Sequence, residues 1–379
     1  MKRSIDHILT THAGSLPRPD DLAHMMYDLM DGKPVDQAKL QARITEATAE
    51  VVKKQIDLGI DVIADGEMSK PNFQTYVTKR WTGFGNTGEM LVSFDDLADF
   101  PNVAREIWDM EGMKHRPMPV VVAPIKVGDP NAVLRDIADL KAAMGNRSPD
   151  DAFIPAAPPS LVTATPNRYY KTFEEYTEAV CEALRYEYKA IIDAGFNLQL
   201  DAPDLPMHGH CQIGLAPRDI KKYVPAAIEA MNHAIRGLPP DKIRLHVCWG
   251  NYPGPHHLDV ELREIVEPLL KINASFIYVE AANPRHEHEW EVWNEVKLPD
   301  GKALIPGVID SVTNHVEHPR LVAQRIERFA EIVGKENVIA GTDCGFGTYV
   351  GMSACDPQVA WLKLQALSEG ARIASDRLY

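Results

Sequence analysis

Two side chains that bind soft metal ions stand two residues apart in the middle of the chain. His246 and Cys248 close a segment in which Ile243, Leu245 and Val247 alternate with other residues. Such alternation is typical of a buried β-strand, and it places residues i and i+2 on the same side. The pattern therefore predicts that the imidazole and the thiol meet at the end of a strand and share one ion.

Two later segments end in further metal-binding groups. Residues 276–280 are apolar up to a final glutamate, and residues 338–345 are strand-like and carry a cysteine near their end. Zinc in proteins is held by thiolate, imidazole and carboxylate groups in tetrahedral geometry. We therefore predict a zinc site at the ends of three strands of one sheet, formed by His246, Cys248, Glu280 and Cys344.

The charge of this ligand set indicates its chemistry. Two thiolates and one carboxylate outweigh the charge of a zinc ion, so the set is unsuited to making hydroxide from water and suited to holding a substrate thiol as thiolate. A weakly bound Glu280 would leave and free a position for that sulfur. The prediction is a thiol alkyltransferase. A hydrolase or lyase that works through metal hydroxide is an alternative, and so is a non-catalytic protein that binds metal or thiols.

Other metal-binding residue types have simpler interpretations. His208, His210 and Cys211 form a rival cluster in an expected loop, where histidines are usually solvated. His286 and His288 lie in a charged segment that we expect to be a solvated loop, with the rim of a pocket as the alternative. A lone cysteine is often only a small buried apolar side chain. The predicted site therefore depends on its residues ending strands of the same sheet.

The composition is that of an ordinary globular protein and excludes several partners. The chain has 379 residues, of which 45% are hydrophobic and 25% charged, and its net charge is −14. This acidity argues against nucleic-acid binding, which requires a basic face, and no apolar run is long enough to span a membrane. The N-terminus lacks the apolar core of a signal peptide. We therefore expect a cytoplasmic protein whose five cysteines do not form disulfides.

Strands and helices alternate along the chain, which predicts a parallel sheet covered by helices. Helical spacing is found in residues 36–58, 172–194 and 319–333. A doubly wound sheet is the alternative, but no glycine-rich phosphate turn follows the first strand. Nine strand candidates compete for eight places, and we assign the proline-flanked run 120–122 to the outside. The fold expected for residues 1–379 is a single (β/α)8 TIM barrel with an irregular excursion after the second strand.

Polar and reactive residues follow the predicted strands, at the rim where barrel enzymes place their active sites. The motifs are Thr10-Thr11-His12-Ala13-Gly14-Ser15, Asp65-Gly66-Glu67, Gln199-Leu200-Asp201, His246-Val247-Cys248, Val279-Glu280 and Asp343-Cys344-Gly345. In type and order they resemble the cobalamin-independent methionine synthase family, specifically its C-terminal catalytic barrel and its short single-barrel members. The resemblance implies a TIM barrel and the same four zinc ligands.

The resemblance also implies contacts with a substrate. In the family, the residues that match Gly14, Ser15, Glu67 and Asp201 contact the thiol substrate, and the two carboxylates hold the amino group of homocysteine. The chemistry agrees, because an ammonium group is bound best by anionic partners. The expected reaction is a methionine synthase-like methyl transfer to a homocysteine-like thiol, as in methionine biosynthesis.

The chain departs from the family pattern on the side of the alkyl donor. It has no room for the second, N-terminal barrel that helps to bind folate in the full-length enzymes. The family's proton-donating histidine lies two residues after the aspartate that matches Asp310, and Val312 holds that position here. We take His315, together with Asp310, as the candidate catalytic residues, with His318 as the alternative to His315. The family's aromatic residue for pterin stacking is missing from the matching run 156–160.

Three alkyl donors are compatible with these departures: methyl-folate, a methylcorrinoid protein and an epoxide. The runs 248–252 and 283–290 look more like the epoxyalkane:coenzyme M transferases, short relatives that open an epoxide with a zinc-bound thiolate. Coenzyme M carries a sulfonate, for which Arg18, Arg285 and His286 are the candidate partners. The thiol, the donor and the oligomeric state are left open by the sequence.

Overall fold

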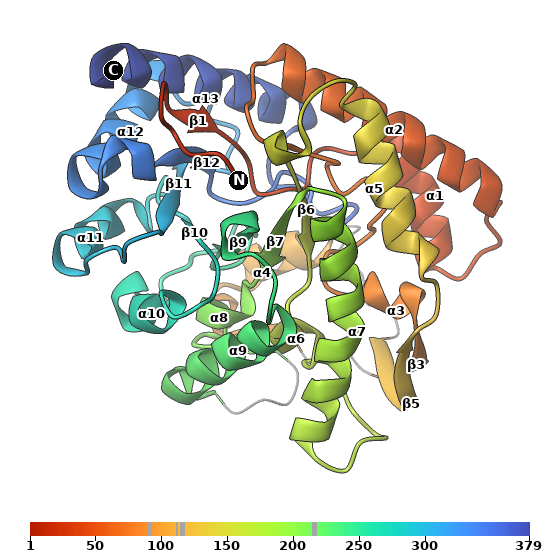
Figure 1. Ribbon diagram of the computed structural model, residues 1–379. Coiled ribbons are helices and arrows are strands. Elements are labelled where there is room, and N and C mark those ends of the chain that lie inside the picture. Colours follow the sequence, from red (N-terminus) through yellow and green to blue (C-terminus); the bar gives the residue numbers. More distant parts are fainter. Residues whose placement is uncertain (89–91, 111–112, 114–117, 214–217) are drawn as a thin grey trace.

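Eight parallel strands form the central sheet of this protein (Figure 1). The structure, a computed structural model, describes residues 1–379 except 89–91, 111–112, 114–117 and 214–217. Neighbouring strands follow the order β1-β12-β11-β10-β9-β7-β6-β2, and the ladders between them are parallel. The strands are β1 Leu9–Thr10, β2 Ile63–Ala64, β6 Ala152–Ala156, β7 Asn197–Asp201, β9 Ile243–Val247, β10 Phe276–Val279, β11 Ala303–Ile309 and β12 Ile339–Thr342.

The sheet closes on itself between β1 and β2. The amide of Val62, directly before β2, donates to the carbonyl oxygen of Thr10 at 2.9 Å. The hydroxyl of Thr11 donates to the carbonyl oxygen of Val62 at 2.9 Å, and the Asp61 carboxylate accepts from the amide and the hydroxyl of Thr10. Because this seam joins the two ends of the strand order, the fold is the predicted (β/α)8 barrel.

Helices connect successive strands and cover the outside of the barrel (Figure 1). The predicted helix at 36–58 is α2, and the Asp36 carboxylate caps it by accepting from the amides of Ala38 and Lys39. Among the described residues, no helix combines the length and the hydrophobicity needed to cross a membrane. The covering helices are α2 Gln37–Asp57, α5 Asn131–Ala143, α7 Phe173–Asp193, α9 Ile220–Ala234, α10 Leu262–Leu269, α11 Val292–Glu295, α12 Pro319–Val333 and α13 Pro357–Leu378.

Alternation along the strands divides the core into two layers. In β10, Phe276 and Tyr278 belong to a cluster inside the barrel, with Ile305 of β11 as a neighbour. The intervening Ile277 and Val279 belong to the larger cluster between the strands and the helices. The same rule places every second residue of a strand inside the barrel, so a polar residue at such a position must find its partners there.

A buried arginine fills the middle of the barrel. Arg244 of β9 donates to the Thr11 hydroxyl at 2.9 Å and to the His12 carbonyl oxygen at 2.8 Å. Its guanidinium lies against the rings of Phe153 and Tyr278. Burial lowers the pKa of Arg244 to about 10, so the side chain is charged at neutral pH. The arginine therefore forms a rigid polar layer two residues before His246 in the same strand.

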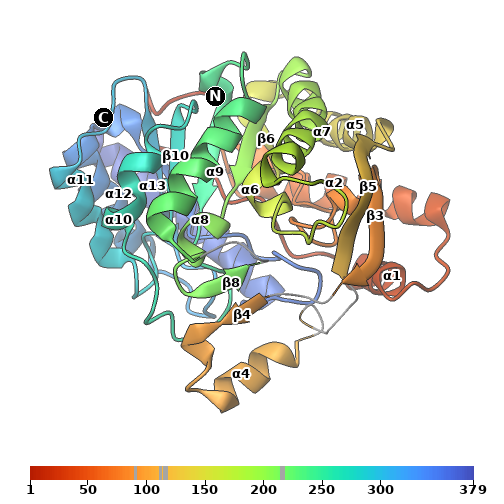
Figure 2. The ribbon, with the colours of Figure 1, turned by 90° about the horizontal axis from the view of Figure 1, so that it is seen from below.

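The excursion after β2 packs outside the barrel. β3 (Trp81–Gly88) pairs antiparallel with β5 (Met118–Val127), which confirms that the run 120–122 is not a barrel strand. β4 (Val92–Phe94) pairs antiparallel with β8 (Cys211–Ile213). Figure 2 shows β4 and α4 beyond the ring of barrel helices. The remaining elements are α1 Asp20–Met30, α3 Val77–Arg80, α4 Pro101–Trp108, α6 Pro159–Val162, α8 Asp204–Met207 and the short 3-10 helices η1 Asp95–Leu97, η3 Pro149–Asp151, η4 Pro240–Lys242, η5 Glu287–Glu291 and η6 Lys335–Asn337.

The expectation of a solvated loop around His208 and His210 is wrong. Both side chains are buried. The ring of His208 stacks on Tyr223 with 3.8 Å between centroids, and Nε2 of His210 lies 3.4 Å from the Asp259 carboxylate. β8, which follows this segment directly, pairs with β4, and no local sequence pattern indicates that long-range contact.

Arg244→Ala should lower the free energy of unfolding by at least about 2 kcal/mol, because it opens a cavity between two rings and leaves buried acceptors unpaired. The control Arg372→Ala removes an exposed arginine paired with Asp376 at 3.2 Å, and should change it by less than about 0.5 kcal/mol. Urea unfolding followed by circular dichroism measures both. Similar small effects in the two variants would show that the interior arginine does not stabilise the barrel.

Candidate metal centre

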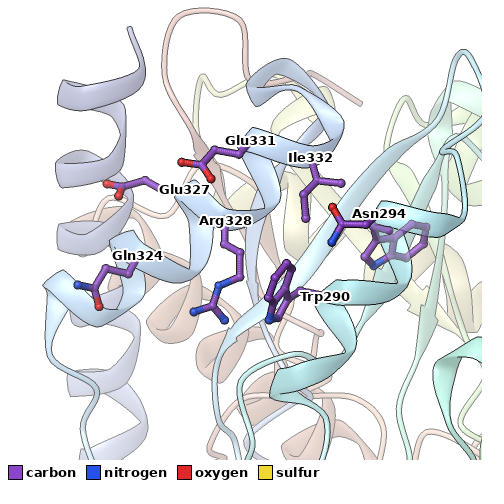
Figure 3. A pocket seen from close by; sticks show the side chains of 8 residues that line it. Trp290, Asn294, Gln324, Glu327, Arg328, Glu331 and Ile332 are labelled. Carbon is purple, nitrogen blue, oxygen red and sulfur yellow. The ribbon is translucent and has the colours of Figure 1, made fainter.

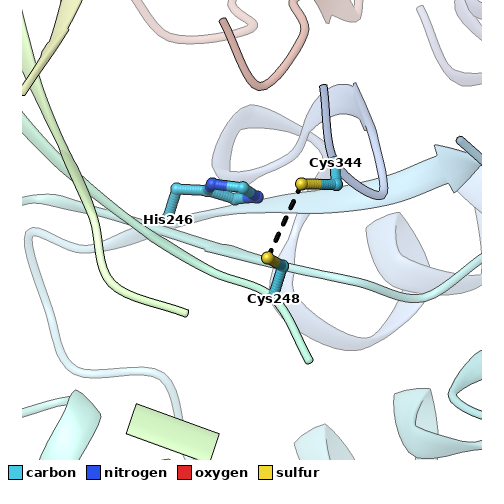
Figure 4. Close-up of side chains that lie close together, drawn as sticks. All are labelled: His246, Cys248 and Cys344. Carbon is cyan, nitrogen blue, oxygen red and sulfur yellow. Dashed lines mark hydrogen bonds between the residues drawn. The ribbon is translucent and has the colours of Figure 1, made fainter. Parts of the chain in front are cut away.

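Three of the four predicted ligands converge at the rim of the barrel. The metal-binding atoms of His246, Cys248 and Cys344 lie within 4.8 Å of one another, and all three side chains are buried. His246 belongs to β9, Cys248 follows that strand directly, and Cys344 lies two residues after β12. Figure 4 shows the two sulfur atoms facing each other beside the imidazole ring. The i, i+2 spacing thus brings the His246 imidazole and the Cys248 thiol together at the end of β9, as the sequence predicts.

The dimensions of this cluster fit a zinc ion. Tetrahedral zinc with Zn–S bonds of about 2.3 Å holds two sulfurs roughly 3.8 Å apart, and the sulfurs of Cys248 and Cys344 are 3.5 Å apart. The hydrogen bond with Cys344, together with burial, raises the pKa of Cys248 well above its ordinary value. Metal binding here would therefore release protons.

The Asp201 carboxylate orients the imidazole of this cluster. Asp201 Oδ1 lies 2.8 Å from Nδ1 of His246 and accepts a further hydrogen bond of 2.7 Å from the Gln199 side chain. Because an ionised carboxylate only accepts, this pairing puts the proton on Nδ1. Nε2, which lies 3.2 Å from the carbonyl oxygen of Asp343, is then the nitrogen that can bind a metal. In β7, Gln199 and Asp201 lie on one side of the strand, so the pair faces into the barrel.

Glu280, the fourth predicted ligand, lies beside the cluster rather than in it. It follows β10 and is buried, but it is not one of the residues whose ligand atoms lie within 4.8 Å of one another. Its Oε1 accepts from the amide of Trp249 at 2.9 Å, and its Oε2 accepts from the side-chain amide of Asn283 at 2.8 Å. Burial and the neighbouring Cys248 raise the pKa of Glu280. Its role as a ligand stays a prediction.

A buried carboxylate ties together the strand ends that carry the site. Asp343 Oδ1 accepts from the amides of Ala281 and Ala282, each at 2.9 Å. Its Oδ2 accepts from the amide and the side chain of Asn283 at 2.8 and 2.9 Å. A Cβ atom at Gly307 would lie 2.1 Å from Asp343 Oδ1, so β11 needs glycine there. These contacts fix the end of β12 against the end of β10.

The metal-binding cluster forms part of the wall of a cavity of about 580 Å³. The three cluster residues share this wall with the side chains of Ser15, Glu67 and Asp201. The rest of the wall is largely aromatic and aliphatic, and includes Phe73, Phe94, Met207, Tyr252, Tyr349 and Met352. The cavity therefore joins a soft-metal cluster, an acidic corner and an apolar wall.

The acidic corner contains an unpaired carboxylate. Glu67 is buried, and within the described part of the chain its Oε2 has no hydrogen-bond partner. Burial, and then the charge of Asp201, raise the pKa of Glu67 to about 8. Glu67 also has a φ of 59°, a left-handed conformation that is strained for a residue with a side chain. A bound cation would relieve the electrostatic repulsion between the buried carboxylates of Glu67 and Asp201, and the unpartnered Oε2 of Glu67 could accept a hydrogen bond from it.

Gly14 lies against this corner and Ser15 lines the same cavity, while their contact with a substrate stays a prediction. Gly14 has a φ of 122°, and a Cβ there would stand 3.1 Å from Glu67 Oε1 and 3.0 Å from the Pro155 side chain. The carbonyl oxygen of Ser15 accepts from the amide of Phe346. The turn after β1 thus requires glycine and leaves room beside the Glu67 carboxylate.

The predicted proton donor does not reach the cavity. His315 is exposed, and neither His315 nor Asp310 is among the described residues that line the cavity. Asp310 accepts from the amide of Val312 at 2.9 Å and from the Thr313 hydroxyl at 2.5 Å, which is a turn contact. His318 caps α12 by accepting from the Arg320 amide. The catalytic roles of Asp310 and His315 stay predictions with no supporting contact.

The expectation of a solvated loop at His286 is also wrong. His286 is buried, with Nε2 2.9 Å from Asp259 and Nδ1 2.8 Å from Glu289. Burial alone would lower its pKa, but hydrogen bonds with these two carboxylates raise it to about 10. His288, in contrast, is exposed. The sequence pattern could not show that two acidic residues enclose one of the two histidines.

A second cavity, of about 710 Å³, lies between α11 and α12 on the outside of the barrel. Its lining includes Trp290, Trp293 and Arg328, and the Arg328 guanidinium lies 5.0 Å from the centroid of the Trp290 ring (Figure 3). None of its lining residues is a predicted ligand or substrate contact. The cavity beside His246 is therefore the candidate active site, although it is the smaller.

Comparisons with known proteins find relatives in the family that the sequence motifs resemble. The profile of the cobalamin-independent synthase catalytic domain matches residues 8–104. The methionine synthase of Sulfolobus acidocaldarius is 25% identical over 379 residues, which cover 100% of this chain and 95% of that protein. The methionine synthase of Thermococcus kodakarensis is 24% identical and covers 97% of this chain and 94% of its own.

These matches support the resemblance to the cobalamin-independent methionine synthase family. The structure of a B12-independent methionine synthase from Shewanella sp. W3-18-1 in complex with selenomethionine has the same fold. It matches with a TM-score of 0.76 at 22% identity, over 98% of this chain and 99% of that one. A putative vitamin-B12 independent methionine synthase from Listeria monocytogenes matches with a TM-score of 0.64 at 19% identity.

In the motif Asp343-Cys344-Gly345, the sequence pattern predicted a role for the cysteine and none for the aspartate. It also missed Asn283, which bridges Asp343 and Glu280. The only signal was the Asn-Pro pair at 283 and 284, which is typical of a turn. A turn signal does not tell which distant carboxylate an amide will reach, so these roles needed the structure.

Cys248→Ser should lose bound zinc, because one of the three convergent ligands is removed. Cys211→Ser should keep it, since Cys211 lies in β8 and belongs to no group of described residues able to hold a metal. Zinc per chain, measured by atomic emission after desalting, checks both variants. Loss of zinc from Cys211→Ser alone would move the site to the rival cluster.

Proposed function

We propose that this chain is a zinc-dependent homocysteine S-methyltransferase, with one catalytic domain spanning residues 1–379 and a cytoplasmic location. The observation that carries the proposal is the shared cavity, in which a buried His–Cys–Cys cluster and a buried acidic pair line the same space. The names of the curated relatives, methionine synthases matched over nearly their whole length, support it.

The metal-binding residues and Asp201 have defined tasks in this proposal. His246, Cys248 and Cys344 hold the metal, with Glu280 as a weak fourth ligand. Zinc, when bound, lowers the pKa of an incoming thiol so that the sulfur can attack a methyl group at neutral pH. Asp201 keeps the His246 imidazole in one tautomer and orientation. The donated methyl group passes to sulfur, and the donor leaves with the bonding electron pair.

The acidic corner selects an acceptor that carries an amino group. The unpaired Oε2 of Glu67 is placed for an ammonium group, and both recorded hydrogen bonds of the Asp201 carboxylate use Oδ1, which leaves Oδ2 for a ligand. Homocysteine bears an amine three bonds from the carbon that carries its thiol. The metal-binding cluster and the two carboxylates can therefore engage opposite ends of one small molecule.

A coenzyme M-type acceptor fits the cavity less well. The three cations considered for its sulfonate are engaged elsewhere: Arg18 donates to backbone carbonyls, Arg285 lies near the Asp259 carbonyl oxygen, and His286 is held by two carboxylates. None of the three lines the cavity. A sulfonate beside Glu67 would face like charge, so the epoxide-opening alternative has no supporting contact.

The apolar wall of the cavity suits the binding of the methyl donor. Phe73, Tyr349 and Met352 offer no charge to a donor and limit the water that reaches the thiol. An attacking thiolate is more reactive when it is less solvated. The identity of the donor is the open part of the proposal, with methyl-folate and a methylated corrinoid as the candidates.

The zinc-loaded protein should form methionine from homocysteine with methyl-folate or methylcobalamin, in a screen that also includes a small epoxide, whose opening would give an S-(2-hydroxyalkyl) product instead. Cys248→Ser should reduce the rate at least about 1,000-fold, because the thiol is no longer activated, whereas Cys211→Ser should stay near the wild-type rate. Mass spectrometry of the products measures transfer. Transfer to coenzyme M and none to homocysteine would overturn the proposed acceptor.

Homocysteine affinity should depend on pH in a way set by Glu67. Its pKa is raised to about 8, so below that pH the carboxyl is protonated and must lose its proton before it can pair with an ammonium group. Affinity should therefore rise by up to about tenfold per pH unit between pH 6 and 8. Calorimetric titration measures this rise.

Two controls isolate the Glu67 contribution to that pH dependence. 4-Mercaptobutyrate has the same thiol and carboxylate but no amine, so subtracting its pH dependence removes the contribution of thiol ionisation. Glu67→Gln should abolish the remaining difference and weaken homocysteine binding about tenfold or more. A difference that persists in this variant would show that another group binds the amine.

A further inference from the structure

A segment from outside the barrel forms part of the cavity wall. Residues 92–110, which we call the arm, comprise β4, η1 and α4. Although β4 and α4 lie beyond the ring of barrel helices (Figure 2), Phe94 of the arm lines the cavity that contains the metal-binding cluster. The arm also contributes Leu97 to an apolar cluster with Tyr252 and Met352, both of which line the cavity. The arm therefore covers the apolar side of the candidate active site.

One carboxylate of the arm reaches into the loop that follows Cys248. Asp96 is fully buried. Its Oδ2 accepts from the Tyr252 hydroxyl at 2.7 Å and from the His256 amide at 3.1 Å. Hydrogen bonds to a carboxylate are among the stronger ones in proteins, and a buried donor that loses its acceptor finds no water to replace it. These two bonds therefore join the arm firmly to the loop that carries part of the cavity wall.

The loop is packed tightly around these two bonds. The Tyr252 ring lies against Gly250 and Gly254, where a Cβ atom would come within 2.7 and 2.2 Å of ring carbons. His256 has a φ of 54°, a left-handed conformation that persists in a residue with a side chain only where neighbouring groups enforce it. Because the His256 amide is one of the two donors to Asp96, loss of this carboxylate would allow the loop to relax.

We propose that Asp96 is a positioning residue that holds the arm over the cavity and so keeps solvent from the cysteine sulfurs and from the thiol that is to be methylated. The inference rests on the proposed function for the identity of that thiol. Without the Asp96 carboxylate, a buried hydroxyl and the amide of a strained residue lose their acceptor. The ladder between β4 and β8 remains, so the loss should open the cavity locally and leave the fold intact.

The free cysteines of the chain provide the test. A buried thiol reacts with iodoacetamide only while it is exposed, so its labelling rate follows the fraction of open molecules. In the full-length chain after removal of zinc, Asp96→Ala should label Cys248 and Cys344 at least about tenfold faster than the wild type. Cys181, which lies in α7 and donates to the Ala230 carbonyl oxygen of α9, should keep its wild-type rate. Mass spectrometry of peptides measures the rate at each cysteine.

Two further variants isolate the contribution of the contact. Tyr252→Phe removes only the hydroxyl and keeps the ring, so it should speed labelling of the two cluster cysteines by a smaller factor, about threefold or more. Asp95→Ala is the matched control, because the neighbouring Asp95 is exposed and its ion pair with Arg218, at 2.5 Å, is screened by solvent. Its labelling rates should stay within about twofold of the wild type.

Equal labelling rates of the cluster cysteines in Asp96→Ala and Asp95→Ala would overturn the inference. An equal acceleration at Cys181 would also overturn it, because Asp96 would then stabilise the whole fold rather than the cover of the cavity. If Asp96→Ala does not fold, Tyr252→Phe decides alone, and wild-type rates at Cys248 and Cys344 in that variant refute the inference. Labelling requires no catalysis, so a protein that transfers no methyl group to homocysteine would refute the proposed function and leave the role of Asp96 in closing the cavity.

Discussion

The buried carboxylate of Asp343 is the constraint on which the candidate site depends. It receives four hydrogen bonds from three consecutive residues after β10. A carboxylate in a low-dielectric interior is tolerated only when it is saturated in this way. The arrangement fixes the distance between the loop that carries Glu280 and the turn that carries Cys344. It also explains why β11 has glycine at position 307, where any side chain would meet the carboxylate.

Polar and aromatic side chains inside the barrel also hold His246 in place from the layer below it. Arg244 lies in the layer below His246 on the same face of β9, and Tyr278 contacts both side chains. Rings on two sides and two hydrogen-bond acceptors hold the guanidinium still. The His246 imidazole therefore packs against a fixed layer of side chains, and its hydrogen bond with Asp201 sets its orientation. A metal site built this way needs little reorganisation when the ion binds.

The sequence was most informative where one periodicity governed a whole segment. Alternation in β9, the apolar run of β10 and the helical spacing of α12 predicted these elements to within a residue or two. The i, i+2 spacing placed His246 and Cys248 on one face. The errors concern contacts between distant segments. His208 and His210 are buried beside β8, which pairs with β4, and burial of His286 follows from Asp259. Likewise, no local pattern shows that Asn283 reaches Glu280, or that His315 points to solvent.

The pairing of β1 with β12 has a consequence for biosynthesis. The first strand of the barrel has its ladder partner in the last one, and Cys344 lies just beyond that last strand. A chain emerging from the ribosome in order holds His246 and Cys248 long before its second metal-binding thiol exists. Two of the three ligands bind zinc weakly compared with the complete set. Assembly of the proposed metal site would therefore wait for synthesis of the segment after β12, and a chain terminated before Cys344 would lack one of the three convergent ligands.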